Sequence, residues 1–133
     1  LRNVVQLARA EDPRLVIDFE GEPFDIALDQ AIPLGLITRE LVANVARHVV
    51  PVTDRPKLRI AWTTDKERLR LQFEDNGPGF SERSLQNPES LGFLITLALA
   101  EQLQGTIEKE AGSGGATVTV TAAYNPPTPL EET

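Results

Sequence analysis

The sequence predicts an α+β fold, a two-layer sandwich in which helices pack on one face of a mixed, mostly antiparallel sheet. Two apolar stretches, near residues 30–49 and 91–105, have the period of helices. Two pairs of shorter segments alternate apolar and polar residues on either side of a turn, as the strands of hairpins do. A chain of 133 residues is also long enough to bury one core of its own.

The first half of the chain predicts one strand followed by the long helix. Residues 1–10 have apolar residues at helical spacing, and we expect them to be the end of a linker or helix of a preceding domain. Residues 14–20 alternate and predict a strand. For the long helix we expect Asp29 as the N-cap, Pro33 in the first turn and Pro51 as the stop.

The second half predicts two hairpins with the second helix between them. Residues 57–64 and 68–75 flank the turn sequence DKE, and residues 106–110 and 116–123 flank AGSGG. Because glycine often terminates helices, we expect the intervening helix to end at Gly105. The hairpins supply the antiparallel part of the sheet.

Two polar segments mark a loop and the end of the domain. Residues 76–90 are rich in Gly, Pro, Ser and Asn and predict a loop before the second helix. Residues 125–133 form a Pro-rich acidic tail that we expect to be disordered. The folded domain should therefore span residues 11–124.

Composition excludes several kinds of site. The net charge of −7 argues against nonspecific binding of nucleic acid. With no Cys and one His, the chain has neither disulfides nor thiolate or multi-histidine metal centres. No apolar run has the length of a membrane span, and no signal peptide is visible. The absence of Met indicates a piece of a longer product.

Asp75 is the first candidate binding residue. It shares its parity with Leu69, Leu71 and Phe73, so it should point toward the core at the end of its strand. A buried carboxylate needs hydrogen-bond donors. One interpretation is that Asp75 accepts bonds from the following turn NGPG. The other is that its partner is the amine of a ligand.

The long helix carries the second group of candidates. Glu40, Asn44 and His48 recur every four residues and should form one row on a helix that is otherwise largely apolar. For Asn44 the alternative to a binding role is a solvated polar residue. For His48 it is a surface or core histidine with its hydrogen bonds satisfied.

Three segments together resemble the Bergerat-fold (GHKL) ATPases, the superfamily of gyrase, heat-shock chaperone, histidine kinase and mismatch-repair ATPases. RELVANVARH, residues 39–48, resembles their N box, and DNGPGF, residues 75–80, resembles their first glycine box. SLGFLITLALAEQLQGTIEKEAGSGGATVTV, residues 90–120, is similar to the second glycine segment, helix and final hairpin of sensor histidine kinases. The short loop before SLGF is similar to the subgroup with abbreviated ATP lids.

The resemblance implies that the N box holds Mg-ATP. Asn44 would hold the Mg²⁺ that bridges the phosphates, since one amide oxygen suffices when ATP supplies other ligands. Glu40 matches the residue that orients the attacking group or acts as general base. Arg47 stands where the family commonly has Lys and would contact phosphate, and His48 would line the same pocket.

The glycine boxes would bind the rest of the nucleotide. By resemblance, Asp75 accepts a hydrogen bond from the adenine amine, and Gly77 and Gly79 allow the backbone to approach a flat ligand. Leu91 and Gly92 belong to the second glycine segment, which the resemblance assigns to nucleotide binding.

The sequence departs from the family pattern at three places. Arg39 stands where the subgroup usually has Asn. Ala116 stands where the last hairpin often has a Thr that supports the adenine-binding aspartate, which leaves Thr117 as the candidate substitute. LGF has one glycine and so fewer backbone amides for the phosphates. Because of these departures, an affinity for nucleotide below that of the family remains an alternative.

The resemblance predicts the ATP-binding catalytic domain of a two-component sensor histidine kinase. Such a domain is cytoplasmic, binds ATP and Mg²⁺, and phosphorylates a His on a separate dimerisation domain, with a response regulator downstream and a dimer in the full-length protein. It would contact neither nucleic acid nor membrane. His48 lies inside the N box, so the isolated domain should not phosphorylate itself. Two alternatives are an anti-sigma-factor-type serine kinase and a degenerate pseudo-ATPase that serves as an interaction module.

Overall fold

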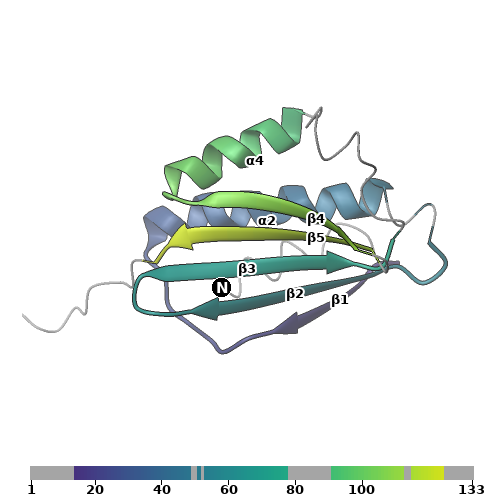
Figure 1. Ribbon diagram of the computed structural model, residues 1–133, viewed down its shortest axis with the longest axis horizontal. Coiled ribbons are helices and arrows are strands. Elements are labelled where there is room, and N and C mark those ends of the chain that lie inside the picture. The colour runs from purple at the N-terminus through teal and green to yellow at the C-terminus, as the bar shows by residue number, and fades with distance from the viewer. Residues whose placement is uncertain (1–13, 49–50, 52, 78–90, 113–114, 125–133) are drawn as a thin grey trace, which may run out of the picture.

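The computed structural model describes residues 14–48, 51, 53–77, 91–112 and 115–124. Its strands form one five-stranded sheet in the order β1-β2-β3-β5-β4 (Figure 1). β1 pairs with β2 in parallel, and the other neighbouring pairs are antiparallel. The sheet is thus mixed and mostly antiparallel, as predicted. The strands are β1 (Val16–Glu20), β2 (Lys57–Thr64), β3 (Arg68–Asp75), β4 (Thr106–Gly112) and β5 (Gly115–Ala123).

Two helices, α2 (Leu28–His48) and α4 (Leu91–Gln102), cover the same face of the sheet (Figure 1). The predicted two-layer α+β architecture is therefore confirmed. Between the layers lies the core, to which both helices and all five strands contribute apolar side chains. Neither of these two described helices combines the length and apolarity that crossing a membrane requires. The most deeply buried large apolar side chains are Leu34, Ile37, Val42, Leu58, Leu69, Leu71 and Val120.

Helix α2 begins two residues earlier than predicted. The carbonyl of Ala27 accepts hydrogen bonds from the backbone N–H groups of Gln30 and Ala31, so Ala27 rather than Asp29 is the N-cap. Asp29 instead lies in the first turn, where its negative charge interacts favourably with the positive end of the helix dipole. Pro33 lies inside the helix, beyond the predicted first turn. The helix ends at His48, shortly before Pro51.

The end of α4 corrects the prediction for Gly105. The helix stops at Gln102, and Gln104 takes the left-handed conformation, with φ of 57°. The N–H groups of Gln104 and Gly105 bond to the carbonyls of Glu101 and Ala100, which is a Schellman motif. Gly105 is needed for space, because a Cβ there would lie 1.8 Å from the carbonyl oxygen of Thr121.

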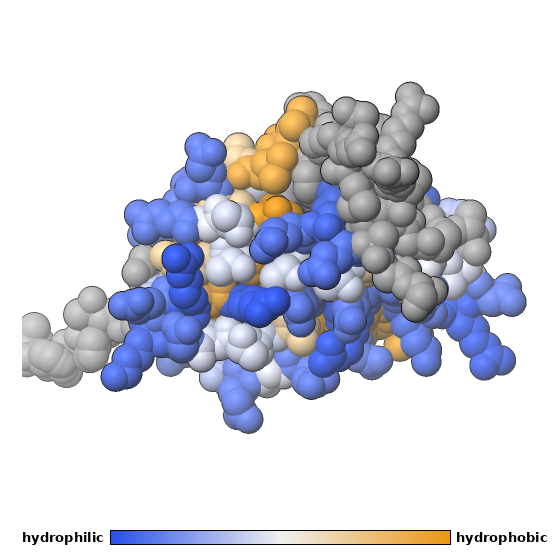
Figure 2. All heavy atoms as spheres, viewed as in Figure 1, coloured by the Kyte–Doolittle hydropathy of each residue, from blue (hydrophilic) through white to orange (hydrophobic). Residues whose placement is uncertain are grey.

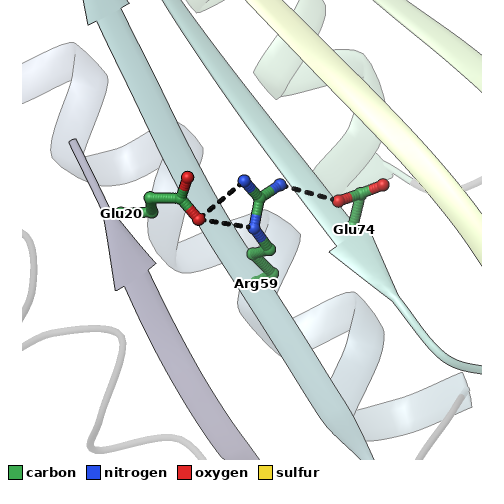
Figure 3. A network of polar contacts seen from close by, with 3 residues as sticks. All are labelled: Glu20, Arg59 and Glu74. Atoms are coloured by element: carbon green, nitrogen blue, oxygen red, sulfur yellow. Dashed lines mark hydrogen bonds and ion pairs between the residues drawn. The ribbon is translucent and has the colours of Figure 1, made fainter.

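The face of the sheet opposite the helices is polar. Figure 2 shows hydrophilic residues over most of this side, while apolar atoms gather at the top, over α4. Across three strands of this face, Arg59 on β2 bonds to Glu20 on β1 at 2.8 Å and to Glu74 on β3 at 2.9 Å (Figure 3). This network ties the parallel edge strand to the antiparallel part of the sheet.

Candidate functional site

Helix α2 places Glu40, Asn44 and Arg47 on one side and its apolar residues on the other. Leu41, Val42 and Val45 are buried against the sheet. On the other side, Arg47 donates from Nη2 to Glu40 Oε2 at 3.2 Å and to Asn44 Oδ1. The spacings of three and seven residues bring these groups together on a helix. Two members of the predicted row, Glu40 and Asn44, thus lie together, and Arg47 joins them. The side chain of the third member, His48, lies outside the described part of the chain.

Asp75 lies at the end of β3 and is half-buried. Its Oδ1 accepts a hydrogen bond from the backbone N–H of Gly77 at 2.9 Å. Burial raises the pKa of Asp75 above its usual value, and bonds from the backbone N–H groups of Gly77 and Ala116 partly oppose this shift. The turn contact of the first interpretation is therefore present. Since a carboxylate offers about four lone-pair sites, it also leaves capacity for a ligand donor.

The backbone of β5 closes tightly around Asp75. Gly115 has a φ of 141°, which residues with a side chain rarely adopt. A Cβ at Gly115 would lie 1.8 Å from the carbonyl oxygen of Asp75. Only glycine therefore lets the start of β5 approach the end of β3 this closely, and this approach brings the N–H of Ala116 to the carboxylate.

Asn76 is not among the residues predicted from the sequence. Its side chain accepts from the N–H of Lys57 and donates to the carbonyl of Arg55, each at 2.8 Å. Its backbone N–H bonds to the carbonyl of Lys57 at 3.3 Å. Asn76 thus fastens the turn after Asp75 to the segment before β2. The hairpin register contained the signal, because Leu58 pairs with Asp75 and places Lys57 beside the next residue.

Thr117 lies on the other face of the sheet from Asp75. The register pairs Thr117 with Glu74, whereas Ala116, one residue earlier, follows the side of Asp75. Neighbouring residues on a strand point to opposite faces. The structure does not bring the Thr117 hydroxyl to Asp75, so it gives no support to Thr117 as a substitute for the usual Thr.

The other predicted residues are only partly described. His48 is the last residue of α2, and Leu91 and Gly92 begin α4. Gly79 lies outside the described residues. The C-terminal half of α2 and the end of β3 lie toward the same end of the molecule (Figure 1). The structure therefore places Glu40, Asn44 and Arg47 of α2 at the same end of the domain as Asp75 of β3.

A separate hollow of about 540 Å³ lies at the start of β1 and β2. It is lined by Arg14, Val16 and residues 53–57. It contains none of the residues that the sequence predicted for nucleotide binding, although Asn76 bonds to the backbone of its wall.

The fit of Mg²⁺ can be judged from the oxygen atoms of α2. Within the described parts of the chain, no group of three or more His, Cys, Asp or Glu side chains could hold a metal. A metal here would need ligands from the nucleotide phosphates, as Mg²⁺ usually takes them. The guanidinium of Arg47 on Asn44 Oδ1 and Glu40 Oε2 shows that these oxygens accommodate a cation.

Comparison with solved structures finds the same fold in histidine kinases. The histidine kinase domain of the Erythrobacter litoralis blue-light activated histidine kinase has a TM-score of 0.79 at 20% identity, with 92% of this chain and 58% of that chain covered. This chain thus spans less than two thirds of that domain. The Acinetobacter baumannii histidine kinase AdeS has a TM-score of 0.78 at 21% identity, covering 93% and 64%.

A mycobacterial relative matches over nearly its whole length. The mycobacterial sensor histidine kinase MprB has a TM-score of 0.72 at 16% identity, covering 95% of this chain and 93% of that one. At these identities the likeness concerns the fold. A search of curated proteins finds no match.

The family model of histidine kinase-, DNA gyrase B- and HSP90-like ATPases matches residues 29–126, which is most of the chain. The matched region contains residues 39–48, 75–80 and 90–120, the three segments that carry the resemblance in the sequence. The fold and the family model agree, and the chain belongs to this family of ATPases, with the fold of histidine kinase catalytic domains.

Proposed function

We propose that this chain is the ATP-binding catalytic domain of a two-component sensor histidine kinase. It binds Mg-ATP, and the γ-phosphoryl group passes to a His on a separate dimerisation domain. The observation that carries this proposal is the joint placement of Glu40, Asn44 and Arg47 on one side of α2, within a chain of this ATPase family. Family membership supports the nucleotide, and the three side chains support the phosphoryl transfer.

Each side chain has a distinct role in the proposal. When bound, Mg²⁺ would neutralise phosphate charge. The amide oxygen of Asn44 would hold the metal. Glu40, whose side chain is 28% exposed, would orient the incoming imidazole or take its proton. Asp75 would accept a hydrogen bond from the exocyclic amine of adenine, and Gly77, Leu91 and Gly92 would line the nucleotide site.

The partners follow from the same proposal. The phosphoryl group goes to the dimerisation domain and then to a response regulator, and the full-length protein works as a dimer on the cytoplasmic side. The matched structures described above are all of proteins named as histidine kinases, which supports this assignment over a serine kinase or a pseudo-ATPase.

Radiolabelled ATP tests the proposal. With [γ-³²P]ATP the isolated chain should stay unlabelled, and addition of the dimerisation domain of the full-length protein should give an acid-labile phosphohistidine on that domain. Asn44→Ala should abolish Mg²⁺-dependent binding without unfolding the helix, since Ala is the better helix former. Glu40→Gln should bind ATP normally and transfer slowly. Acid-stable label on serine would establish the serine kinase instead, and absence of ATP binding would establish the pseudo-ATPase.

A further inference from the structure

Arg47 occupies the two oxygen atoms on which the proposed chemistry depends. Its Nη2 lies 3.2 Å from Glu40 Oε2 and also donates to Asn44 Oδ1. The two acceptors are therefore one carboxylate oxygen and one amide oxygen, and the group that donates to them is a cation. A cationic side chain therefore already contacts the oxygen atom that is proposed to hold the metal.

The guanidinium and Mg²⁺ favour the same atoms. Mg²⁺ prefers hard oxygen ligands, and a guanidinium donates its hydrogen bonds to the same carboxylate and amide oxygens. Two cations a few ångströms apart repel each other. Arg47 therefore has to leave Asn44 when a metal binds there, and the nearest new anion is the nucleotide phosphate itself.

We propose that Arg47 is a built-in counter-cation. It holds Glu40 and Asn44 in the metal-free domain, gives way to Mg²⁺ when Mg-ATP binds, and then turns to the phosphates. This inference rests on the proposed function, because it takes Asn44 as the metal ligand. It adds an order to the binding event and makes Arg47 a positioning residue for both side chains.

The exchange is energetically feasible because the contact is exposed. The side chain of Arg47 is 53% exposed and that of Glu40 is 28% exposed. Ion pairs this exposed are weak, and they shift an equilibrium by about fivefold at most. Mg-ATP can therefore displace the guanidinium at little cost, while the contact still fixes the side chains beforehand.

The experiment compares the Kd of ATP in EDTA with the Kd in Mg²⁺ by calorimetry on the 133-residue chain. Without metal, Arg47→Gln removes the cation that faces the phosphates, so affinity should fall about ten- to a hundredfold. With Mg²⁺ the metal supplies the charge and no longer has to displace a guanidinium. The loss should then be smaller, and the ratio of Kd in EDTA to Kd in Mg²⁺ should rise about fivefold.

Three controls sharpen this result. Arg70→Gln removes the same charge from the exposed face of β3 and should leave the ratio unchanged. Arg47→Lys keeps a cation but not the planar fork, and its ratio should lie between those of wild type and Arg47→Gln. The melting temperature of each variant verifies that it is folded.

Equal losses with and without Mg²⁺, or no loss at all, would overturn the inference. Asn44→Ala separates this failure from failure of the proposed function. If Asn44→Ala removes the effect of Mg²⁺ while Arg47→Gln leaves the ratio unchanged, Asn44 is the metal ligand and only the role of Arg47 is wrong. If Asn44→Ala retains the full effect of Mg²⁺, the proposed metal site itself is wrong.

Discussion

At each end of strand β3 an aspartate accepts hydrogen bonds from the backbone of a turn, and the two aspartates differ in burial. At the start, Asp65 Oδ1 accepts from the N–H groups of Glu67 and Arg68 at 2.8 and 2.7 Å. At the end, Asp75 Oδ1 accepts from the N–H of Gly77 at 2.9 Å. The bonds to Glu67 and Arg68 lower the pKa of Asp65, whereas burial raises the pKa of Asp75. The local hydrogen-bond motif is shared, but the two environments differ.

The difference separates a structural aspartate from a candidate binding one. Asp65 is exposed, and its carboxylate favours the charged form because the turn is its partner. Asp75 is held in a half-buried place where its charge is disfavoured until another donor arrives. A carboxylate whose pKa is raised by burial is typical of binding sites, because a purely structural turn does not need a buried carboxylate.

The largest effect should come from the glycine that encloses Asp75. Gly115→Ala should lower stability by about 2 to 4 kcal/mol, because overpacking and a positive φ both oppose the new Cβ. It should also weaken ATP binding, because the backbone of Asp75 must move. Gly105→Ala is the matched control, with an equally close contact to Thr121 at the other end of β5. It should lower the melting temperature and leave the ATP affinity of the folded fraction unchanged.

Asp75→Asn should separate binding from folding. The loss of a charged acceptor costs about 1.5 to 3 kcal/mol, which is roughly ten- to a hundredfold in ATP and ADP affinity. The amide oxygen can still accept from Gly77, so the melting temperature of the ligand-free domain should not fall. Calorimetry should also show that wild type prefers ATP to GTP, since an ionised carboxylate only accepts. A lower melting temperature with unchanged affinity would mean that Asp75 serves the turn alone.

Asp65→Asn should give the opposite pattern. Its carboxylate accepts two backbone hydrogen bonds as a charged group, and the amide replaces them with weaker neutral ones. The melting temperature should fall slightly, while ATP affinity stays at the wild-type value. An effect on affinity from this distant hairpin would show that the two ends of β3 are coupled.

The smallest effect is a difference in the pH dependence of stability. The folded pKa of Asp65 is lowered, so its stabilisation is present above the unfolded pKa and is lost as pH falls through the folded pKa. The folded pKa of Asp75 is raised, so its contribution is present below the unfolded pKa and is lost as pH rises through the folded pKa.

Urea denaturation from neutral to acid pH measures this difference. At neutral pH, Asp65→Asn should be less stable than wild type, and Asp75→Asn should be equal or slightly more stable. Both differences should shrink in acid. If the two variants change with pH in the same direction, burial does not control the charge of Asp75.

The strands were more predictable than the ends of the helices. β2 and β3 have the predicted bounds because their alternation is strict and the turn between them is short. At the helix ends, Ala27 caps α2 and Gln104 takes the left-handed position of α4. Backbone carbonyls and the packing of Gly105 on β5 determine these ends, and neither is visible as a residue preference.

Within the candidate site, the sequence predicted residue types better than contacts. The inward parity of Asp75 and the shared side of Glu40 and Asn44 followed from period alone. The contact of Arg47 with both depends on the rotamer of a long side chain. The prediction for Thr117 failed for a different reason. A shift of one residue along β5 moves a side chain to the other face of the sheet, so Thr117 cannot replace a Thr at position 116.

The parallel pairing of β1 with β2 has a consequence for the folding kinetics. The hairpins β2–β3 and β4–β5 join neighbouring segments, so they can close early with little loss of chain entropy. Val16 pairs with Lys57 only after the whole of α2 has crossed the sheet. The edge strand should therefore join last, and the bond of Arg59 to Glu20 on β1 then acts mainly on the rate at which β1 detaches again.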